Sequence, residues 1–310
     1  MYDIIIIGAG PAGLTAATNT SNRGLKTLLI EQYEKPGGQP LIFYPDKLIK
    51  DHPGFPVGVL GKEFARLLEM QALNAGAEIR CNEEALKIGR KEDHLELRTN
   101  NAVYQAKRII ICTGLLNVPN KLSVLSNYKG EGVFYKIGSL SQFKGRNVVV
   151  IGGGQNAFDI ALQLKEVAGN VGIVVRHEYA RATDETVREA ERKGIVVHYN
   201  SELVGIENKE KVTKATIVNT KTNHASETKA DAIFSAIGFS TVNKFLQDNG
   251  IEQNKDGSIK TSGSYETSIP GVFAAGDVNG EVKVIAVACA RGIEAAVHTF
   301  SSIKKPYWLS

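Results

Sequence analysis

Two glycine-rich turns contain the residues of this sequence that are best suited to bind a dinucleotide. The first, Gly8–Gly13, reads Gly-Ala-Gly-Pro-Ala-Gly, and the second, Gly152–Ala157, reads Gly-Gly-Gly-Gln-Asn-Ala. Both have the G-x-G-x-x-G/A spacing with which backbone amides and a helix N-terminus bind the pyrophosphate of a dinucleotide. Such a turn is weak evidence alone, so the elements around each turn decide whether it has this function.

The first turn lies between an expected strand, Tyr2–Ile7, and an expected helix, Pro11–Arg23. A short isoleucine run bounded by glycine is typical of a strand buried on both faces of a parallel sheet. A second expected strand, Thr27–Ile30, completes a βαβ unit and ends at Glu31, 18 residues after Gly13. An acid at this place accepts hydrogen bonds from an adenosine ribose, so the unit predicts a dinucleotide whose ribose carries no 2′-phosphate.

Each residue of the first turn has a physical task in this interpretation. Gly8 permits the tight turn, Gly10 lets the backbone approach the pyrophosphate, and Gly13 lets the helix pack closely on the strand. Pro11 and Ala12 open the helix, whose positive end faces the phosphates. These five residues and Glu31 are therefore the first predicted contacts.

The second turn has the same surroundings. It follows an expected strand, Asn147–Ile151, precedes an expected helix from Asn156 to about Ala168, and leads to an expected strand, Val171–Val175. The predicted nucleotide contacts within this turn are Gly152, Gly154, Gln155 and Asn156.

The second unit has no acid at the end of its second strand and carries Arg176, His177 and Arg181 instead. A guanidinium offers a bidentate fork to a 2′-phosphate, which favours NADP(H) over NAD(H). The alternative is a set of exposed surface charges, with an arginine paired to Glu185 or Glu189.

Length and composition agree with two nucleotide-binding domains. The chain has 310 residues, of which 43% are hydrophobic and 23% charged, an ordinary globular balance. Expected strands that end in glycine turns recur at Ile109–Gly114, Ala232–Gly238 and Val272–Asp277, and a helix is expected around Ala286–Phe300. The predicted fold class is α/β, with two Rossmann-like domains. The second domain (116–240) is inserted into the first (1–115 and 241–310).

Charge and cysteine content exclude several classes. A net charge of +4, spread along the chain, makes nucleic acid a poor partner, and no signal peptide or membrane span is recognisable. Cys81, Cys112 and Cys289 can form neither a disulfide scaffold nor a metal knuckle, and they fit a reducing cytoplasm. We expect Cys112 and Cys289 to be small buried hydrophobic residues.

Together these motifs resemble the low-molecular-weight pyridine nucleotide–disulfide oxidoreductases, which include thioredoxin reductase. The resemblance implies resident FAD in the first domain, a nicotinamide dinucleotide in the second, and a homodimer. The matching segments span nearly the whole chain: Gly8–Gly13, Gly37-Gly38-Gln39, Thr113-Gly114, Gly152–Ala157, Ala236-Ile237-Gly238 and Gly271–Asp277.

One feature separates the branches of this group. Thioredoxin reductases have a redox-active Cys-x-x-Cys before the second glycine turn, and Val133–Ser139 contains no cysteine. Without a dithiol, electrons cannot pass to a disulfide by thiolate exchange. The segment Gly37–Lys47, continued by Gly54-Phe55-Pro56, resembles instead the thioredoxin-reductase-like ferredoxin–NADP⁺ reductases. That branch implies ferredoxin or flavodoxin as partner. A diaphorase or oxidase with another acceptor, or a flavin-based sensor, stays open.

The resemblance also assigns residues around the flavin. Gly38 and Gln39 are expected at its polar edge, Tyr44 is expected to stack on the isoalloxazine ring, and Asp277 is expected to accept from a ribityl hydroxyl or to cap the last helix. Hydride passes directly between nicotinamide C4 and flavin N5, so no catalytic side chain is required. Further contacts are implied at Asp51, Ala85, Thr113, Gly114, Val118, Ile237 and Ile285.

Charged and aromatic residues complete the expectations. The final helix should direct its positive end at the flavin, with Lys283 nearby as either an added charge or a solvated lysine. Tyr307 or Trp308 could cover a flavin face, or could belong to a frayed tail. The candidate lysines for an acidic partner are Lys47, Lys50, Lys304 and Lys305.

Overall fold

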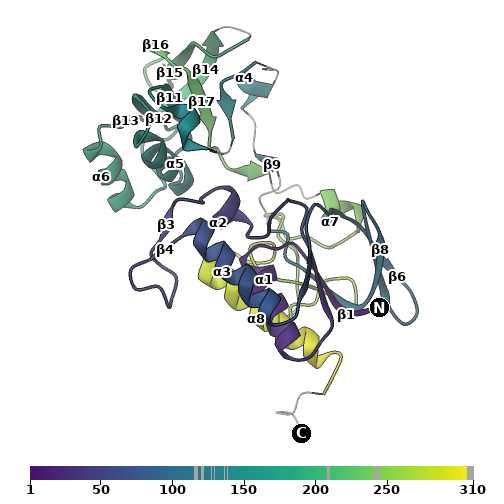
Figure 1. Cartoon of the computed structure of the whole chain (residues 1–310). Coiled ribbons are helices and arrows are strands. Elements are labelled where there is room, and N and C mark those ends of the chain that lie inside the picture. Colours follow the sequence, from purple (N-terminus) through teal and green to yellow (C-terminus); the bar gives the residue numbers. More distant parts are fainter. Residues whose placement is uncertain are drawn as a thin grey trace. The chain divides into compact units, whose positions relative to one another are not determined.

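The computed structural model describes residues 1–114, 118–119, 122–126, 128, 130–135, 137, 139–207, 210–240 and 244–305. The chain divides into two compact units (Figure 1). The first unit comprises Met1–Asn117 and Thr241–Ser310, and the second unit comprises Val118–Ser240. The second unit is thus one continuous stretch, and it interrupts the chain of the first.

The first unit contains a mixed sheet with strand order β5-β2-β1-β8-β7-β6, and β19 pairs with β8. Strands β5, β2, β1, β8 and β19 are mutually parallel, whereas β6 and β7 extend the sheet in antiparallel fashion. The elements are β1 (Tyr2–Ile7), α1 (Pro11–Asn22), β2 (Thr27–Ile30), α2 (Gln39–Ile42), β3 (Leu48–Ile49), β4 (Val59–Leu60), α3 (Gly61–Asn74), β5 (Glu78–Arg80), β6 (Ala85–Arg90), β7 (Leu95–Thr99), β8 (Val103–Ile111), α7 (Lys244–Asp248), β19 (Val272–Ala274) and α8 (Ile285–Ser301).

Strand β1 confirms the prediction of burial on both faces. Ile4 and Ile6 pack into the core beneath α1 and α8, while Ile5 and Ile7 pack into the core on the opposite face. All four are at most 4% exposed. These four positions therefore all need apolar residues, which is why this part of the strand does not alternate.

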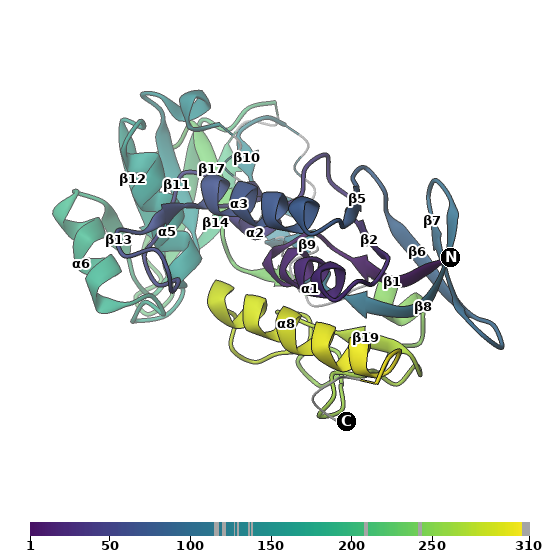
Figure 2. The same ribbon diagram turned by 60° about the horizontal axis from the view of Figure 1, so that its bottom comes forward.

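Helices α1, α3 and α8 lie side by side on one face of this sheet (Figure 2). The contact between α1 and α8 is close enough to require glycine, because a Cβ on Gly292 would lie 2.3 Å from the carbonyl oxygen of Ala12. A Cβ on Gly13 would similarly lie 1.8 Å from the carbonyl oxygen of Gly8. Helix α8, which is distant in sequence, is thereby held directly on the first glycine turn.

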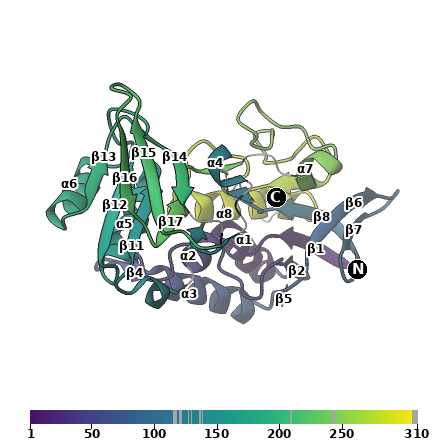
Figure 3. The same cartoon turned by 90° about the horizontal axis from the view of Figure 1, so that it is seen from above.

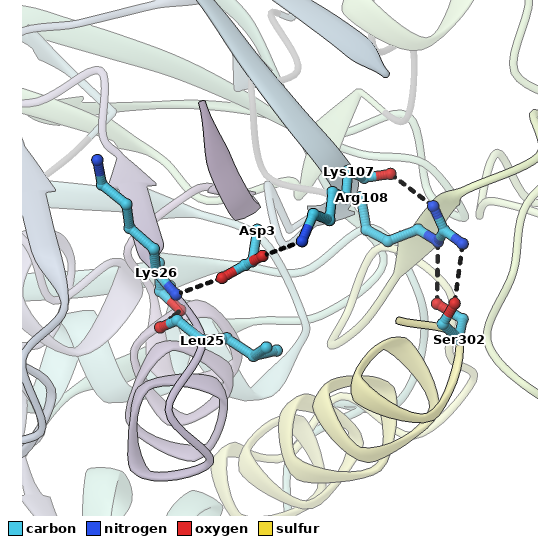
Figure 4. Close-up of polar contacts among 7 residues, drawn as sticks. Asp3, Leu25, Lys26, Lys107, Arg108 and Ser302 are labelled. Carbon is cyan, nitrogen blue, oxygen red and sulfur yellow. Dashed lines mark hydrogen bonds and ion pairs between the residues drawn. The ribbon is translucent and has the colours of Figure 1, made fainter. Parts of the chain in front are cut away.

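Polar contacts fasten the amino-terminal edge of the first unit's parallel strands (Figure 4). Asp3 accepts a hydrogen bond from the Lys26 backbone N–H over 2.9 Å and pairs with Lys107 Nζ at 2.7 Å. Arg108 on β8 donates to both the hydroxyl and the carbonyl oxygen of Ser302, each at 2.9 Å. These bonds fix the C-terminal end of α8, so the opposite end of the helix is held at the carboxyl edge of the sheet.

The second unit contains a five-stranded parallel sheet with order β10-β17-β11-β12-β13. Helices α5 and α6 cover one face, and the antiparallel strands β14, β15 and β16 cover the other (Figure 3). The elements are β9 (Val118–Pro119), α4 (Ser123–Ser126), β10 (Val133–Phe134), η1 (Leu140–Phe143), β11 (Asn147–Ile151), α5 (Gln155–Lys165), β12 (Asn170–Val174), α6 (Asp184–Arg192), β13 (Val196–His198), β14 (Ser201–Glu207), β15 (Lys214–Asn219), β16 (Ala225–Lys229), β17 (Ala232–Ser235) and β18 (Phe239–Ser240).

No element was predicted for the residues that form β14, β15 and β16. Strand β16 is almost wholly exposed, so its residues carry no apolar period. Its position follows from pairing with β15, which is a contact between strands and not a local pattern. No helix in the part of the chain that the structure describes is long and apolar enough to cross a membrane.

Candidate functional site

The predicted flavin contacts gather at the carboxyl edge of the first unit's parallel sheet. Strand β1 leads to Gly8, β2 leads to Glu31, β8 leads to Thr113 and Gly114, and β19 leads to Asp277. Doubly wound sheets bind their ligands outside the carboxyl ends of the strands. The fold therefore brings together residues that lie far apart in the sequence.

The first glycine turn has the geometry of a phosphate cradle. Gly8 has φ +100°, and a Cβ there would lie 2.6 Å from the Cys112 carbonyl oxygen. A Cβ on Gly38, which has φ +60°, would lie 2.7 Å from Gly10 Cα, so two backbone segments meet where the predicted pyrophosphate lies. Gly10 caps α1, and no side chain occupies the cap. The backbone N–H groups at the N-terminus of α1 thus suit a phosphate, and the Gly8–Gly13 turn fits the pyrophosphate of FAD.

Glu31 lies beneath this turn and is only 6% exposed. Its two carboxylate oxygens accept hydrogen bonds from the backbone N–H groups of Ala9, at 2.8 Å, and Tyr33, at 3.0 Å. Burial raises the pKa of Glu31 above its ordinary value, while these N–H donors oppose the shift. The carboxylate is fixed in orientation, and each oxygen can still accept a further hydrogen bond from a ribose hydroxyl.

Gln39 and Asp277 form the next part of the edge. The Gln39 amide donates to Asp277 Oδ2 over 3.2 Å. Burial raises the pKa of Asp277, and the Gln39 hydrogen bond and the charges of Lys283 and Arg291 oppose that shift. The alternative role of Asp277 as the cap of the last helix is wrong, because the residue at the N-cap of α8 is Val284.

Tyr44 follows α2 and is half-buried. The ammonium of Lys47 lies 5.5 Å from the centre of its ring, within the range of a cation–π contact. Asp51 is exposed in the loop between β3 and β4, Ala85 begins β6, and Ile285 begins α8. No side chain caps the N-terminus of α8, so its N–H groups are available at this edge.

The second glycine turn repeats the arrangement within the second unit. A Cβ on Gly152 would lie 2.4 Å from the Ala236 carbonyl oxygen, while one on Gly154 would have no atom within 4 Å. Gly154 caps α5 without a side-chain hydrogen bond, as Gly10 caps α1. The turn therefore leaves room for a phosphate beside the helix N-terminus.

The side chain of Gln155 has structural partners. It accepts a hydrogen bond from the Thr183 N–H at 3.0 Å and donates to Asp159 and Thr186, each at 3.0 Å. Gln155 thus joins the start of α5 to the start of α6. Asn156 occupies the second position of α5, and Ile237 lies beyond the end of β17, partly buried.

The basic residues lie beside this turn. The Arg181 N–H donates to the Gly153 carbonyl oxygen over 2.6 Å, which places Arg181 next to the turn although it lies 27 positions after Gly154 in the sequence. Arg176 lies two residues after the end of β12. It pairs with Glu202 at 2.9 Å, so its carboxylate partner is neither Glu185 nor Glu189.

The neighbours of these arginines are also paired. Glu178 pairs with Lys221 at 2.6 Å, and the rings of His177 and Tyr179 stack with centroids 6.1 Å apart. Because Lys221 offsets the charge of Glu178, that acid weakens the local positive field less than its sequence position indicates.

Three of the predicted site residues lie wholly or partly outside the described part of the chain. Two further residues near the site were not predicted. The side chain of Val118 and the whole of Tyr307 and Trp308 lie outside the described residues. The two residues that were not predicted are Asn279, whose Oδ1 is buried without a partner among the described residues, and Arg291, whose charge acts on Asp277. The close approach of Arg291 to Gly280 is a tertiary contact and has no signal in the local sequence.

The cysteines confirm the sequence-based expectation. Cys112 and Cys289 are buried, and Cys81 is partly exposed. Burial raises the pKa of each thiol, to about 12 for Cys112. The 310 residues contain no Cys-x-x-Cys pair. Within the described residues no group of three or more His, Cys, Asp and Glu side chains could hold a metal.

Comparison with known proteins gives consistent results. The sequence model described as pyridine nucleotide-disulphide oxidoreductase matches residues 2–292. The ferredoxin–NADP reductase of Acholeplasma laidlawii is 35% identical over 293 residues, which are 92% of this chain and 89% of that protein. The ferredoxin–NADP reductase of Streptococcus pyogenes serotype M1 is 36% identical over 296 residues, 92% and 88% of the two chains.

Solved structures of thioredoxin reductases share the fold. The enzyme of T. acidophilum superposes with a TM-score of 0.90 at 30% identity and covers 98% of this chain and 99% of its own. The enzyme of Lactococcus lactis in its FR conformation superposes with a TM-score of 0.88 at 31% identity, covering 97% and 98%. Sequence similarity to one kind of reductase thus accompanies structural similarity to another.

Proposed function

The chain belongs to the pyridine nucleotide-disulphide oxidoreductase family, and on that premise we propose that it is a ferredoxin–NADP⁺ reductase. In this proposal FAD is bound by the first unit and NADP(H) by the second. Electrons pass between NADP(H) and a one-electron carrier, which is ferredoxin or flavodoxin. The names of the relatives that are 32–36% identical support this choice of partner.

The observation that carries the proposal is a glycine-rich cradle that fits FAD, combined with the lack of a Cys-x-x-Cys pair. Disulfide reduction by thiol exchange needs an accessible thiolate and a second cysteine to resolve the mixed disulfide. Here the nearest two cysteines in sequence are Cys81 and Cys112, and burial raises the pKa of both. Electrons must therefore leave the flavin by another route, and direct transfer to a one-electron carrier provides it.

The residues of the first unit would bind and orient FAD, which supplies the capacity to accept two electrons together and to release them singly. The Gly8–Gly13 turn binds the pyrophosphate, Glu31 the adenosine ribose, and Asp277 a ribityl hydroxyl. Tyr44 provides a flat aromatic surface for the isoalloxazine ring. The N-terminus of α8 favours negative charge on the ring edge that it faces.

The residues of the second unit would bind NADP(H). The N-terminus of α5 and the turn at Gly154 suit the pyrophosphate, and Arg176 and Arg181 suit the 2′-phosphate. The Glu202 carboxylate competes for Arg176 and must share it or release it when the phosphate binds. Because this ion pair is well exposed, separating it costs little.

The lysine candidates for partner binding separate into two groups within the first unit. Lys47 lies over Tyr44, whereas Lys304 follows the C-terminal end of α8, near Asp3 at the amino edge. Electron transfer requires a short path from the flavin, so we assign an acidic partner to the surface around Lys47 and Lys50. Lys304 and Lys305 have no part in this binding.

The test uses the purified holoprotein under anaerobic conditions. NADPH should bleach the flavin absorbance faster than NADH does, and addition of oxidised ferredoxin or flavodoxin should restore it. Thioredoxin supplied with the same amount of NADPH should remain oxidised. Turnover with dyes or dioxygen but with neither carrier protein would indicate a diaphorase, and absence of bleaching would indicate a sensor; either result would overturn the proposal.

A further inference from the structure

The segment between β19 and α8 carries Asp277 and leads directly into the helix N-terminus at Ile285. Two hydrogen bonds from residues outside this segment fix its position. The Ile259 N–H donates to the Val278 carbonyl oxygen over 2.6 Å, and Arg291 Nη1 donates to the Val282 carbonyl oxygen over 3.1 Å. Arg291 lies in the second turn of α8, so its side chain holds the segment before the helix against the helix itself.

Gly280 makes room for this arginine. The glycine is buried, and a Cβ on it would lie 1.5 Å from Arg291 Nη1 and 2.0 Å from Cζ. The guanidinium therefore occupies the space that a side chain at position 280 would fill. Arg291 is half-buried and donates to the backbone, so the position of its charge is more restricted than that of a solvated lysine.

The positive charge of Arg291 interacts electrostatically with the carboxyl of Asp277. This carboxyl is largely buried, receives a hydrogen bond from Gln39, and is acted on by the positive charges of Lys283 and Arg291. Lys283 is exposed and also acts on Asp256. Arg291 is thus the better shielded of the two cations, and screening by salt weakens a shielded charge less.

We propose that Arg291 is a positioning residue of the flavin site. It fixes the segment 279–283 against α8 and holds a stationary positive charge beside Asp277 and the helix N-terminus. The inference rests on the proposed function, since it takes FAD to be the group bound there. A fixed positive charge favours the negative charge that the isoalloxazine ring gains on reduction, so Arg291 raises the midpoint potential of the bound flavin.

Four variants test this inference. Arg291→Gln removes the charge and keeps a hydrogen-bond donor, and Arg291→Lys keeps the charge. Gly280→Ala retains the arginine but displaces its guanidinium from the backbone. Arg23→Gln removes an equal charge at the distant end of α1, where Arg23 contacts Asn19, and serves as the matched control.

The readouts are the FAD dissociation constant, thermal unfolding of the apoprotein, and the two-electron midpoint potential of bound FAD. Arg291→Gln and Gly280→Ala should weaken binding of reduced FAD about tenfold relative to oxidised FAD, which lowers the potential by about 30 mV. Arg291→Lys should recover most of the loss, and Arg23→Gln should match the parent protein.

A purely structural arginine would give a different pattern. It would lower the apoprotein melting temperature and weaken both redox forms equally, leaving the potential unchanged, and that result would overturn the inference. So would an Arg291→Lys variant with a potential as low as that of Arg291→Gln. If Arg291→Gln does not fold, Gly280→Ala decides by the same criterion. Failure of the parent protein to bind FAD would count against the proposed function, whereas normal binding with an unshifted potential contradicts the role of Arg291 alone.

Discussion

The side-chain amide of Gln39 donates a hydrogen bond to Asp277 and joins two segments that lie 238 residues apart in the chain. One segment follows β2 and the other follows β19. The proposed flavin edge of the first unit therefore needs residues from both ends of the chain. The bond also keeps a buried carboxylate partnered, which lowers the cost of its burial.

Replacing Gln39 by leucine should weaken FAD binding, because Asp277 would lose its hydrogen-bond donor and its orientation. A hydrogen bond to a charged group contributes about 1.5–3 kcal/mol, so the dissociation constant should rise about 10- to 100-fold. Fluorescence titration of the apoprotein with FAD measures this change. Gln105→Leu on the exposed side of β8 is the control, and equal affinities for the two variants would refute the role of the bond.

The contribution of Glu31 to the stability of the apoprotein should fall as pH rises above the ordinary carboxyl pKa of about 4.3. Burial raises the pKa of Glu31 in the folded state, so this side chain binds more protons in the folded protein than in the unfolded chain in the window between the two values. Its contribution to the free energy of unfolding is thus highest below the unfolded pKa and declines through the folded one. Urea unfolding across this window measures the slope.

Glu31→Gln should flatten that slope, since the group no longer titrates. Asp277, whose pKa burial also raises, contributes in the same direction, and Asp277→Asn should remove that contribution. Glu34→Gln, at an exposed position three residues after Glu31, should leave the slope intact. A Glu31→Gln protein with the full parental slope would show that Glu31 is not the titrating group.

The Arg176→Ala/Arg181→Ala double variant should lose preference for NADPH. Charge-assisted hydrogen bonds to a 2′-phosphate are worth about 1.5–3 kcal/mol, so KM for NADPH should rise about 10- to 100-fold while KM for NADH changes little. Steady-state reduction of a dye separates the two constants. The Arg188→Ala/Arg192→Ala double variant on the exposed face of α6 is a charge-matched control, and parallel changes for both nucleotides would reject the phosphate contact.

Lys47→Gln should weaken ferredoxin binding, and Lys304→Gln should not. Both substitutions remove one positive charge from the first unit, but only Lys47 lies beside Tyr44. We expect KM for ferredoxin to rise several-fold in the Lys47 variant and to depend less on salt, because long-range attraction contributes less. Equal salt dependence of the two variants would contradict the proposal that ferredoxin binds the surface around Lys47.

Local sequence pattern predicted the parts of the fold that depend on local burial and turn geometry. Strands β1, β2 and β11 are continuous apolar runs, and the glycine turns after β1 and β11 have backbone requirements that few other residues meet. Strand β16 was beyond prediction because its exposed residues carry no period and its place depends on pairing with β15.

The site shows the same division. Glycine spacing predicted the cradles, but the partners of Gln155 and the approach of Arg181 to Gly153 are contacts between separate segments. The packing of Arg291 on Gly280 depends on how α8 lies against the segment before it, which no local pattern shows. The competing role of Asp277 as a helix cap failed because the segment after it runs to Val284 before α8 begins.

The insertion of the second unit has a consequence for protein synthesis. Strands β1, β2 and β8 leave the ribosome first, but β19 and α8 follow only after the entire second unit. Until α8 has emerged, the face of α1 that packs on it, including Ala12 at its contact with Gly292, has no cover. The second unit can fold from its own continuous stretch while the first waits, so the nascent chain carries an exposed apolar helix through much of translation and is a natural client for chaperones during that interval.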